Sequence, residues 1–473
     1  KTFMKNLTLE NIARACSSEL KNAGGNETRE ITCAVIDSRK IEEGGLFFAT
    51  KGEKVDGHRF IGQVFEKGAA CVVTCMTPEE VEAAYGVPAE AWGPYILVDD
   101  SLRALRKVAS FYRNGLTIPV VGITGSVGKT STKEFIAGVL SEKYCVLKTE
   151  GNFNNEIGLP LTLLRIQEEH EVAVVEMGIS DFGEMSRLGE MAKPDICVIT
   201  NIGQCHLENL HNREGIFRAK TEIFHYMKDG GEVCLNGEDD LLEAVTEVNG
   251  KKVHHFGISD REGFEVYATD IENLGLLGSK AVLHMPEGSC PIEISLPGIH
   301  MVINATAAAL VGRLLGLSLE EIHAGIHNVT PVGGRSNLIK TKDKLVIDDC
   351  YNANPVSMKA AIDLLATATD RKVAILGDMF ELGEKEDSLH AEVGAYAVEQ
   401  GIDAVYCVGT LSKAMYDAAL EAYDGSQDVR YFADRDELMD SLPDLLEPND
   451  TILVKASHGM GFAKVVEALT REA

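Results

Sequence analysis

Short, wholly apolar runs alternate along most of the chain with segments whose apolar residues recur at helical spacing. Between residues 119 and 237 these runs are PVVGITG, VAVVEMG, ICVITNIG and EVCLNG, which are rich in Val and Ile and end in turn residues. This pattern is typical of parallel strands buried on both faces. A second set, KLVIDDCYN, KVAILGDM, DAVYCVG and DTILVKAS, follows after residue 343. The alternation of strands and helices predicts α/β domains built on parallel sheets.

The first hundred or so residues look different, with shorter strands such as GGLFFAT and YILVDD between turns. A chain of 473 residues is too long for one hydrophobic core. Breaks at RNGLTIP and TPVGGRS predict three domains. We expect a mixed α/β domain over residues 1–115, a parallel-sheet domain of phosphate-loop type over 116–332, and a Rossmann-like α/β domain over 333–473.

Charge and composition narrow the classes of partner. The net charge of −28 argues against nucleic acid, because a phosphate backbone needs clustered Lys and Arg, but it does not exclude small anionic ligands. The sequence contains no run of 18 apolar residues, so it does not predict a membrane-spanning helix. The eleven cysteines are scattered, and Cys71 and Cys75 have no matching second pair. We therefore expect free thiols and a cytoplasmic location.

The stretch VVGITGSVGKTSTKEF, residues 120–135, nearly matches a phosphate-binding loop. The general template is G-x-x-x-x-G-K-[ST], yet the residue five before Gly128 is Ile123, with glycines at Gly122 and Gly125 on either side. A strand runs directly into this loop, and apolar residues at helical spacing after it predict a helix that begins near Lys129.

That context favours a nucleotide site over a glycine-rich turn with an incidental GKT. The loop lies at a helix N-terminus, where N–H groups and the helix dipole favour phosphate. Lys129 can reach terminal phosphates and the Thr130 hydroxyl can ligate Mg²⁺. The predicted ATP-binding residues of the loop are Gly125, Ser126, Val127, Gly128, Lys129, Thr130 and Ser131.

Three further polar residues follow strands or lie on a nearby helix. Glu176 ends the strand VAVVEMG, His206 comes just after ICVITNIG, and Lys220 lies fourteen residues later in REGIFRAK. Taken singly, such a His is more often structural and such a Lys more often solvated. Together, downstream of a phosphate loop, they indicate a metal site of oxygen and imidazole ligands.

Eight motifs in order carry a family resemblance: TGSVGKTSTKE, EGNFNNEIGLPLTLL, VVEMG, NIGQCHLE, REGIFRAK, PGIHMVINATAAAL, DDCYNANPVSM and LGDMFELG. From about Asp37 to Lys455 the chain resembles the Mur ligases of peptidoglycan synthesis. That family uses T-G-[ST]-x-G-K-[ST] for its phosphate loop, which explains the missing glycine at Ile123.

More narrowly, the motifs resemble the branch that joins D-alanyl-D-alanine to a UDP-N-acetylmuramoyl tripeptide, with ATP and through an acyl phosphate. The resemblance implies a monomer. Two alternatives stay open. The first alternative is a related ligase that adds a different amino acid. The D-N-P-R loop of the relatives that add a diamino acid is absent from this sequence, and the relatives that add glutamate to folate lack the N-terminal domain. The second alternative is a nucleotide-dependent regulatory ATPase, which hydrolyses ATP without joining two substrates.

The resemblance also implies residue roles. Thr130 and Glu176 hold the Mg²⁺ between the β- and γ-phosphates, and His206 helps hold a second Mg²⁺. Lys220 matches a lysine that CO₂ converts to a carbamate, an anionic ligand that a buried Lys of lowered pKa can form. With Lys129, these are the expected catalytic residues.

The remaining roles concern the three substrates. Asn304 contacts adenine, Arg335 the phosphates and Asp349 the ribose; Met301 replaces the first Asn of the family's H-N-x-x-N segment. Ser38, Arg39 and Lys51 face the UDP end of the substrate, although DSR is also compatible with an ordinary turn. Asn352 and Asn354, in the loop YNANP, help position the dipeptide.

Overall fold

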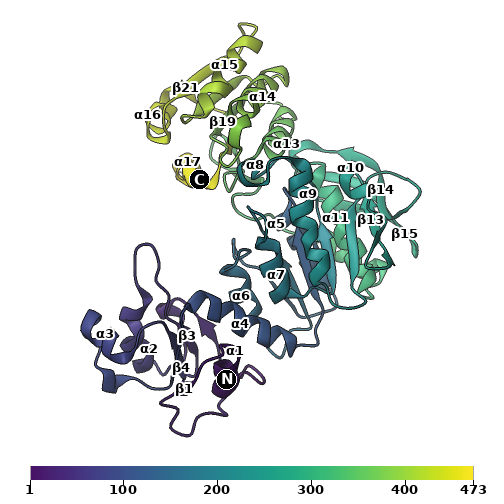
Figure 1. The fold of residues 1–473 in the computed structure, drawn as a ribbon. Coiled ribbons are helices and arrows are strands. Elements are labelled where there is room, and N and C mark those ends of the chain that lie inside the picture. Colours follow the sequence, from purple (N-terminus) through teal and green to yellow (C-terminus); the bar gives the residue numbers. More distant parts are fainter. Residues whose placement is uncertain (1, 472–473) are drawn as a thin grey trace.

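The computed structural model describes residues 2–471, an α/β chain with three main sheets (Figure 1). The first sheet has the strand order β1-β5-β4-β3-β2, in which β1 is antiparallel to β5 and the other pairs are parallel. This confirms a mixed α/β arrangement. Its strands are β1 (Leu20–Lys21), β2 (Ala34–Val35), β3 (Leu46–Phe48), β4 (Cys71–Thr74) and β5 (Tyr95–Leu97), with helices α1 (Leu9–Ala15), α2 (Ile61–Glu66) and α3 (Pro78–Tyr85).

The second sheet has nine strands in the order β16-β15-β14-β13-β10-β9-β6-β8-β7. The four strands predicted between residues 119 and 237 form β6 (Val120–Thr124), β8 (Val172–Glu176), β9 (Ile196–Ile199) and β10 (Glu232–Asn236), all parallel. The sheet also contains β7 (Val146–Lys148), β13 (His254–Gly257), β14 (Phe264–Asn273), β15 (Ser279–Met285) and β16 (Gly288–Ile294). The last three strands pair antiparallel, so the sheet is longer and more mixed than the sequence predicts.

Eight helices accompany this sheet in the part of the chain described: α5 (Lys129–Leu140), α6 (Gly158–Leu163), α7 (Glu184–Ala192), α8 (Leu207–Leu210), α9 (Arg213–Thr221), α10 (Asp240–Glu243), α11 (His300–Leu314) and α12 (Leu319–His327). A separate hairpin pairs β11 (Glu247–Val248) with β12 (Lys251–Lys252). Helix α5 begins at Lys129, as predicted, and packs against α11 and α12.

The third sheet has the order β17-β18-β22-β19-β20-β21, and only β17 pairs antiparallel. The predicted second set of strands forms β18 (Leu345–Asp348), β19 (Lys372–Gly377), β20 (Ala404–Val408) and β22 (Thr451–Lys455), joined by β17 (Asn337–Lys340) and β21 (Asp428–Phe432). The helices are α13 (Pro355–Ala366), α14 (Glu386–Glu399), α15 (Ser412–Ala422), α16 (Arg435–Leu445) and α17 (Ala463–Thr470). A Rossmann-like α/β arrangement is confirmed.

Helix α4 (Ser101–Asn114) connects the first sheet to the second (Figure 1). Asp100 caps its N-terminus by accepting from the backbone N–H groups of Leu102 and Arg103. Its buried apolar residues, Leu105 and Val108 among them, join a core that continues to α6 and α7. Burial at this junction fixes α4 against α6 and α7, two helices of the second sheet, so one face of α4 reaches the site described below.

Within residues 2–471 no helix is both long and apolar enough to cross a bilayer. All eleven cysteines are free, which confirms the expectation of unpaired thiols.

Candidate active site

A cavity of about 760 Å³ lies at the carboxyl ends of the parallel strands of the second sheet. Its walls come from all three parts of the chain: α4, the loop between β6 and α5, the segment 152–157, and the loops that follow β18 and β22. Ligands of open α/β sheets bind at this edge because the loops that follow the strands gather there.

The loop between β6 and α5 has a backbone that only glycine accepts at its first position. Gly125 has φ 148°, and a Cβ there would lie 1.8 Å from Thr200 Oγ1. Gly128 has φ 84° and precedes the first turn of α5. No side chain caps that turn, so its N–H groups face the cavity and suit an anion. The loop therefore has the form of a phosphate site.

Asn201, which follows β9, fixes the middle of this loop. Its Oδ1 accepts from the Val127 N–H at 2.9 Å, its carbonyl accepts from the Ser126 N–H at 3.1 Å, and its Nδ2 donates to the Val127 carbonyl at 2.9 Å. The N–H groups of Ser126 and Val127 thus bind protein, whereas the sequence suggested that Ser126 offers its N–H to phosphate.

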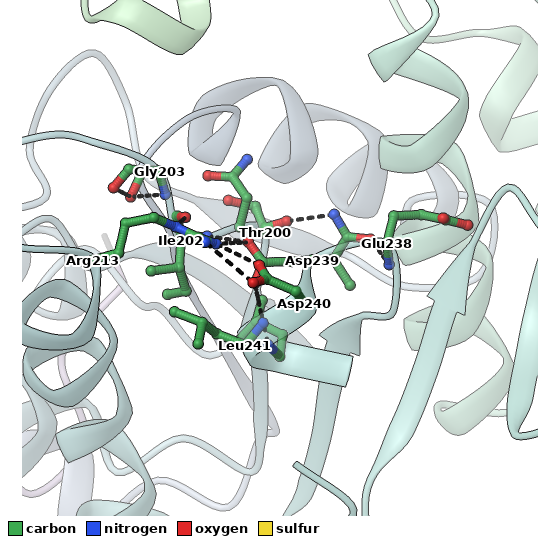
Figure 2. Close-up of polar contacts among 12 residues, drawn as sticks. Thr200, Ile202, Gly203, Arg213, Glu238, Asp239, Asp240 and Leu241 are labelled. Atoms are coloured by element: carbon green, nitrogen blue, oxygen red, sulfur yellow. Dashed lines mark hydrogen bonds and ion pairs between the residues drawn. The ribbon is translucent and has the colours of Figure 1, made fainter. Parts of the chain in front are cut away.

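Figure 2 shows how the residues after Asn201 are held in turn. The Ile202 N–H donates to Asp239 Oδ2 at 2.7 Å, and the Ile202 carbonyl accepts from Arg213 Nε at 2.9 Å. Asp239 Oδ1 also caps α10. Arg213 forms an ion pair with exposed Asp240 at 2.7 Å. A buried carboxylate on one element and a guanidinium on another therefore fix both polar groups of the Ile202 backbone.

Lys129 lies in this loop with its Nζ 2.9 Å from the Gly125 carbonyl, to which it donates. Burial and, to a smaller extent, the positive charge of nearby Lys220 lower the pKa of Lys129 to about 8. The structure thus brings these two predicted residues together. A cation held in a partly buried site without an anion is suited to receive one.

Thr130 and Glu176 each present a buried side-chain oxygen, Oγ1 and Oε1, that no hydrogen bond in the described chain satisfies. Glu176 ends β8, as predicted, and its Oε1 lies 3.3 Å from Lys133 Nζ. Lys133 is buried one turn after Lys129 on α5 and donates to the Thr149 carbonyl at 2.7 Å. Lys133 was missed, although its spacing of four residues from Lys129 places both on one helix face.

His206 precedes α8 in a left-handed backbone conformation with φ 51°, uncommon for a residue other than glycine. Its Nδ1 lies 2.8 Å from Oε2 of Glu381, which belongs to the loop after β19. This contact lowers the pKa of the Glu381 carboxyl. The geometry is that of a close ion pair without a well-aligned hydrogen bond. His206 therefore connects the second sheet to the third.

Lys220 is buried on α9, and no hydrogen bond or ion pair from the described residues reaches its ammonium. Burial lowers its pKa, while partial compensation comes from Cys205 and Glu184 nearby. Its helical position was predicted. A buried amine without a hydrogen-bond or ion-pair partner is unusual in a folded protein, because the cost of desolvating its charge is only partly compensated.

The three residues predicted to hold the rest of the nucleotide line the same cavity. Asn304 Oδ1 accepts from Thr132 Oγ1 at 3.0 Å. The Arg335 guanidinium lies 4.0 Å from the centre of the Tyr351 ring. Asp349 forms an ion pair with Lys455 at 2.7 Å. His300, at the start of α11, and Ser131 also line the cavity.

Asn352 and Asn354 lie in the loop before α13, and both line the cavity. The Asn352 carbonyl accepts from Lys455 Nζ at 2.9 Å. The Asn354 side chain caps α13 by accepting from the Ser357 N–H at 2.9 Å. Asn354 thus has a structural contact that the sequence interpretation did not anticipate.

Ser38, Arg39 and Lys51 lie away from this cavity. Arg39 is 86% exposed and forms an ion pair with Asp37, Ser38 is buried, and Lys51 is exposed. The structure does not bring these residues together with the phosphate loop. Instead, α4 contributes Leu102 and Arg106 to the cavity, and neither was predicted.

Family models match most of the chain. They are the Mur ligase family catalytic domain over residues 30–113, the Mur ligase middle domain over 123–312, and the Mur ligase glutamate ligase domain over 334–458. The UDP-N-acetylmuramoyl-tripeptide–D-alanyl-D-alanine ligase of Bacillus subtilis is 37% identical, with 98% of each chain covered. The chain belongs to the Mur ligase family.

Solved structures of Mur ligases agree with the fold. The chain is similar to MurF from Acinetobacter baumannii, with a TM-score of 0.85, 31% identity and 98% of each chain covered. It is also similar to the MurF ligase of Thermotoga maritima in complex with ADP, with a TM-score of 0.76, 28% identity, and 93% and 97% of the two chains covered. The three-domain α/β fold expected from the sequence is confirmed, and the family uses ATP.

Proposed function

We propose that this Mur ligase joins D-alanyl-D-alanine to a UDP-N-acetylmuramoyl tripeptide at the cost of ATP, in the synthesis of peptidoglycan precursors. The observation that carries the proposal is the phosphate loop in a cavity to which all three parts of the chain contribute. Such a cavity can bring ATP and two further substrates together. Full-length similarity to ligases named for this reaction supports the same substrates.

We divide the chain as the sequence suggests. Residues 1–115 would bind the UDP end through Ser38, Arg39 and Lys51, residues 116–332 would bind ATP, and residues 333–473 would close over ATP and bind the dipeptide through Asn352 and Asn354. We further propose that the enzyme is a cytoplasmic monomer. The free thiols are compatible with a reducing compartment.

ATP would lie with its terminal phosphates against the first turn of α5. Lys129 would leave the Gly125 carbonyl for the β- and γ-phosphates, which restore its full charge. The adenine would lie near Asn304 and the ribose near Asp349, while Arg335 would approach the phosphates from the third domain. These cations offset the repulsion between ATP and the incoming carboxylate.

The donor set fits Mg²⁺. Thr130 Oγ1 and Glu176 Oε1 are buried oxygens without a hydrogen-bond partner in the described chain, and hard oxygen ligands suit this ion. No three His, Cys, Asp or Glu side chains among residues 2–471 gather into a complete metal site. Water and ATP oxygens would therefore complete the first ion, as is usual for Mg²⁺ beside phosphates. When bound, Mg²⁺ neutralises charge on the transferring phosphoryl group.

We propose that His206 and a carbamate on Lys220 hold a second Mg²⁺. The neutral amine of Lys220 would form an N–C bond with CO₂ and release one proton, which yields an anionic oxygen ligand. The lowered pKa and the missing partner of Lys220 support this, since the reaction requires the uncharged amine.

The reaction must activate a carboxylate, which does not react with an amine at neutral pH. Attack of the tripeptide's terminal carboxylate on the γ-phosphorus would break the bond to ADP and form an acyl phosphate. The amine of D-alanyl-D-alanine would then attack the acyl carbon, release phosphate and lose a proton. Closure of the third domain would exclude the water that hydrolyses the acyl phosphate.

Phosphate release separates this function from its alternatives. The test supplies ATP with a panel of UDP-muramoyl peptides and D-alanyl dipeptides, and follows phosphate and the ligated product. We expect release only when a tripeptide acceptor and D-alanyl-D-alanine are both present. Release with free diamino acids would indicate a different ligase, and release without either substrate would indicate a regulatory ATPase.

A further inference from the structure

Arg106 is a cation in the cavity that none of the roles above uses. It lies on α4, and of residues 2–115 only Leu102 and Arg106 line the cavity. Arg106 is half-buried, and no hydrogen bond, ion pair or ring contact from the described residues reaches its side chain. A guanidinium in a cleft without a protein partner is free to bind an anion from solution.

The other Lys and Arg side chains of the cavity each contact protein. Lys129 donates to the Gly125 carbonyl, Lys455 pairs with Asp349, and Arg335 lies against the Tyr351 ring. Among the described residues, Arg106 is therefore the cavity's one Lys or Arg without such a contact.

Carboxylates of the cavity do not neutralise Arg106. Glu156 pairs with Arg187, and Glu184 accepts from the Ser180 N–H at 2.6 Å. Both carboxylates lie where α4 packs, since Glu156 is two residues before α6 and Glu184 begins α7. At this end of the cavity, the carboxylates of Glu156 and Glu184 are thus occupied by contacts within the protein, and the guanidinium of Arg106 is not.

The position of Arg106 decides which substrate it can meet. Helix α4 leads from the first sheet, where the UDP end is proposed to bind, to α6 and α7, which begin at the cavity that holds the phosphate loop. On the proposed function the acceptor extends between these places, whereas ATP would lie against α5 and α11. Figure 1 shows α4 and α6 side by side between the first sheet and the rest of the chain.

We propose that Arg106 binds an oxyanion of the acceptor that lies between its uracil and its reacting carboxylate, an inference that rests on the proposed function. Two groups of the acceptor offer such an anion: the diphosphate, and the free carboxylate that a glutamyl residue retains within the peptide. In each case the Arg106 guanidinium would donate two parallel N–H hydrogen bonds to two oxygens of the anion.

The test measures binding of the UDP-tripeptide by calorimetry without ATP, together with the KM of each substrate. Arg106→Ala weakens acceptor binding and raises the acceptor KM by roughly 10- to 100-fold, because a charge-assisted bidentate contact is lost. The KM for ATP stays within about twofold. Arg106→Lys keeps the charge without the fork and recovers part of the loss.

Arg103→Ala is the matched control. Arg103 lies on the same helix, is exposed, and is absent from the cavity. It leaves acceptor binding unchanged and shows that removal of positive charge from α4 has no general effect. Thermal unfolding of Arg106→Ala stays close to wild type, since no hydrogen bond or ion pair within the described chain is lost.

Two ligands distinguish the sources of the oxyanion. If Arg106→Ala also weakens binding of UDP-N-acetylglucosamine, which has a diphosphate but no carboxylate, the diphosphate is the partner. If the loss disappears for an acceptor with an amidated glutamyl carboxylate, that carboxylate is the partner. A loss that meets neither condition overturns the proposal.

An acceptor KM within twofold of wild type, or an equal rise for ATP and acceptor, also overturns it. Both results are read against a wild-type enzyme that ligates normally. A wild-type enzyme that binds the UDP-tripeptide but does not ligate it would instead contradict the proposed function.

Discussion

The phosphate loop and the segment from Ser38 to Lys51 are two predicted binding regions with opposite structural character. Around the loop, hydrogen bonds join successive segments: Asn201 bonds the backbone of the phosphate loop, and Asp239 and Arg213 bond the backbone that follows Asn201. In the N-terminal segment, Arg39 extends into solvent beside Asp37, and Lys51 is exposed. Hydrogen bonds within the protein hold the backbone of the first region, whereas Arg39 and Lys51 of the second lie at the surface.

This difference suggests how binding energy is divided. A preorganised loop lowers the entropy that ATP must overcome and stabilises charge in the transition state. Exposed donors contribute less, because water competes for them and salt screens them. Substitutions in the loop should therefore affect turnover, and substitutions in the N-terminal segment should affect acceptor binding only weakly.

The largest effect is expected at Lys129. Lys129→Ala removes the charge nearest the transferred phosphoryl group and should lower kcat by about 10³-fold. The fold should stay intact, because alanine favours the first turn of α5. Steady-state kinetics and circular dichroism check both points. Near-normal turnover, or an unfolded variant, would show that the role is misassigned and that the loop is less specialised than we argue.

Lys220→Ala should lower kcat by about 10²-fold, because the proposed carbamate ligand is lost. Small carboxylic acids in solution should restore part of the activity, and CO₂-depleted buffer should lower the activity of the wild-type enzyme. Lys220→Arg is the control, since it keeps a cation that cannot form a carbamate, and acids should not rescue it. A bare amine on Lys220 in a fully liganded, CO₂-replete crystal with both metals would end this idea.

Asp239→Asn should raise the KM for ATP by about 10-fold, because an amide that still caps α10 would place N–H groups against the Ile202 N–H. The loop would then shift with Asn201. Asp240→Asn is the matched control, because Asp240 is 72% exposed and contacts Arg213 without touching the loop. Equal KM values for the two variants would show that these contacts do not order the phosphate loop.

The smallest effect is expected in the N-terminal segment. Arg39→Ala should raise the KM for the UDP-tripeptide by about threefold and leave the KM for ATP unchanged, since an exposed contact contributes little free energy. Measurement of both values separates a binding role from a folding defect, which would raise the two together. If Arg39→Ala raised the KM for the UDP-tripeptide as much as Arg106→Ala does, the N-terminal segment would not be the weakly contributing region that we describe.

Sequence reasoning succeeded where a function follows from local backbone. The strand before Gly125, the helix from Lys129 and the strand end at Glu176 are all set by apolar runs and glycines. The antiparallel strands β14 to β16 were missed, because their apolar runs are short and only half-buried.

Contacts between distant segments left no such signal. Asn201 meets Val127 across more than seventy residues, and Glu381 meets His206 across an even longer stretch. Neither pair has a spacing that a helix or strand would reveal. Arg106 was overlooked for the same reason, because its helix belongs to one region of the chain and its cavity to another.

The contact between His206 and Glu381 would couple the binding of an ion at His206 to the docking of the third domain. His206 belongs to the second sheet and Glu381 to the third, so the pair exists only while the third domain is docked as seen. If His206 ligates Mg²⁺, then any factor by which docking changes the affinity for that ion is the factor by which the ion changes the docking equilibrium. A titration with Mg²⁺ that follows a probe of domain position would measure this coupling factor. The same factor would be obtained from the change in Mg²⁺ affinity on docking.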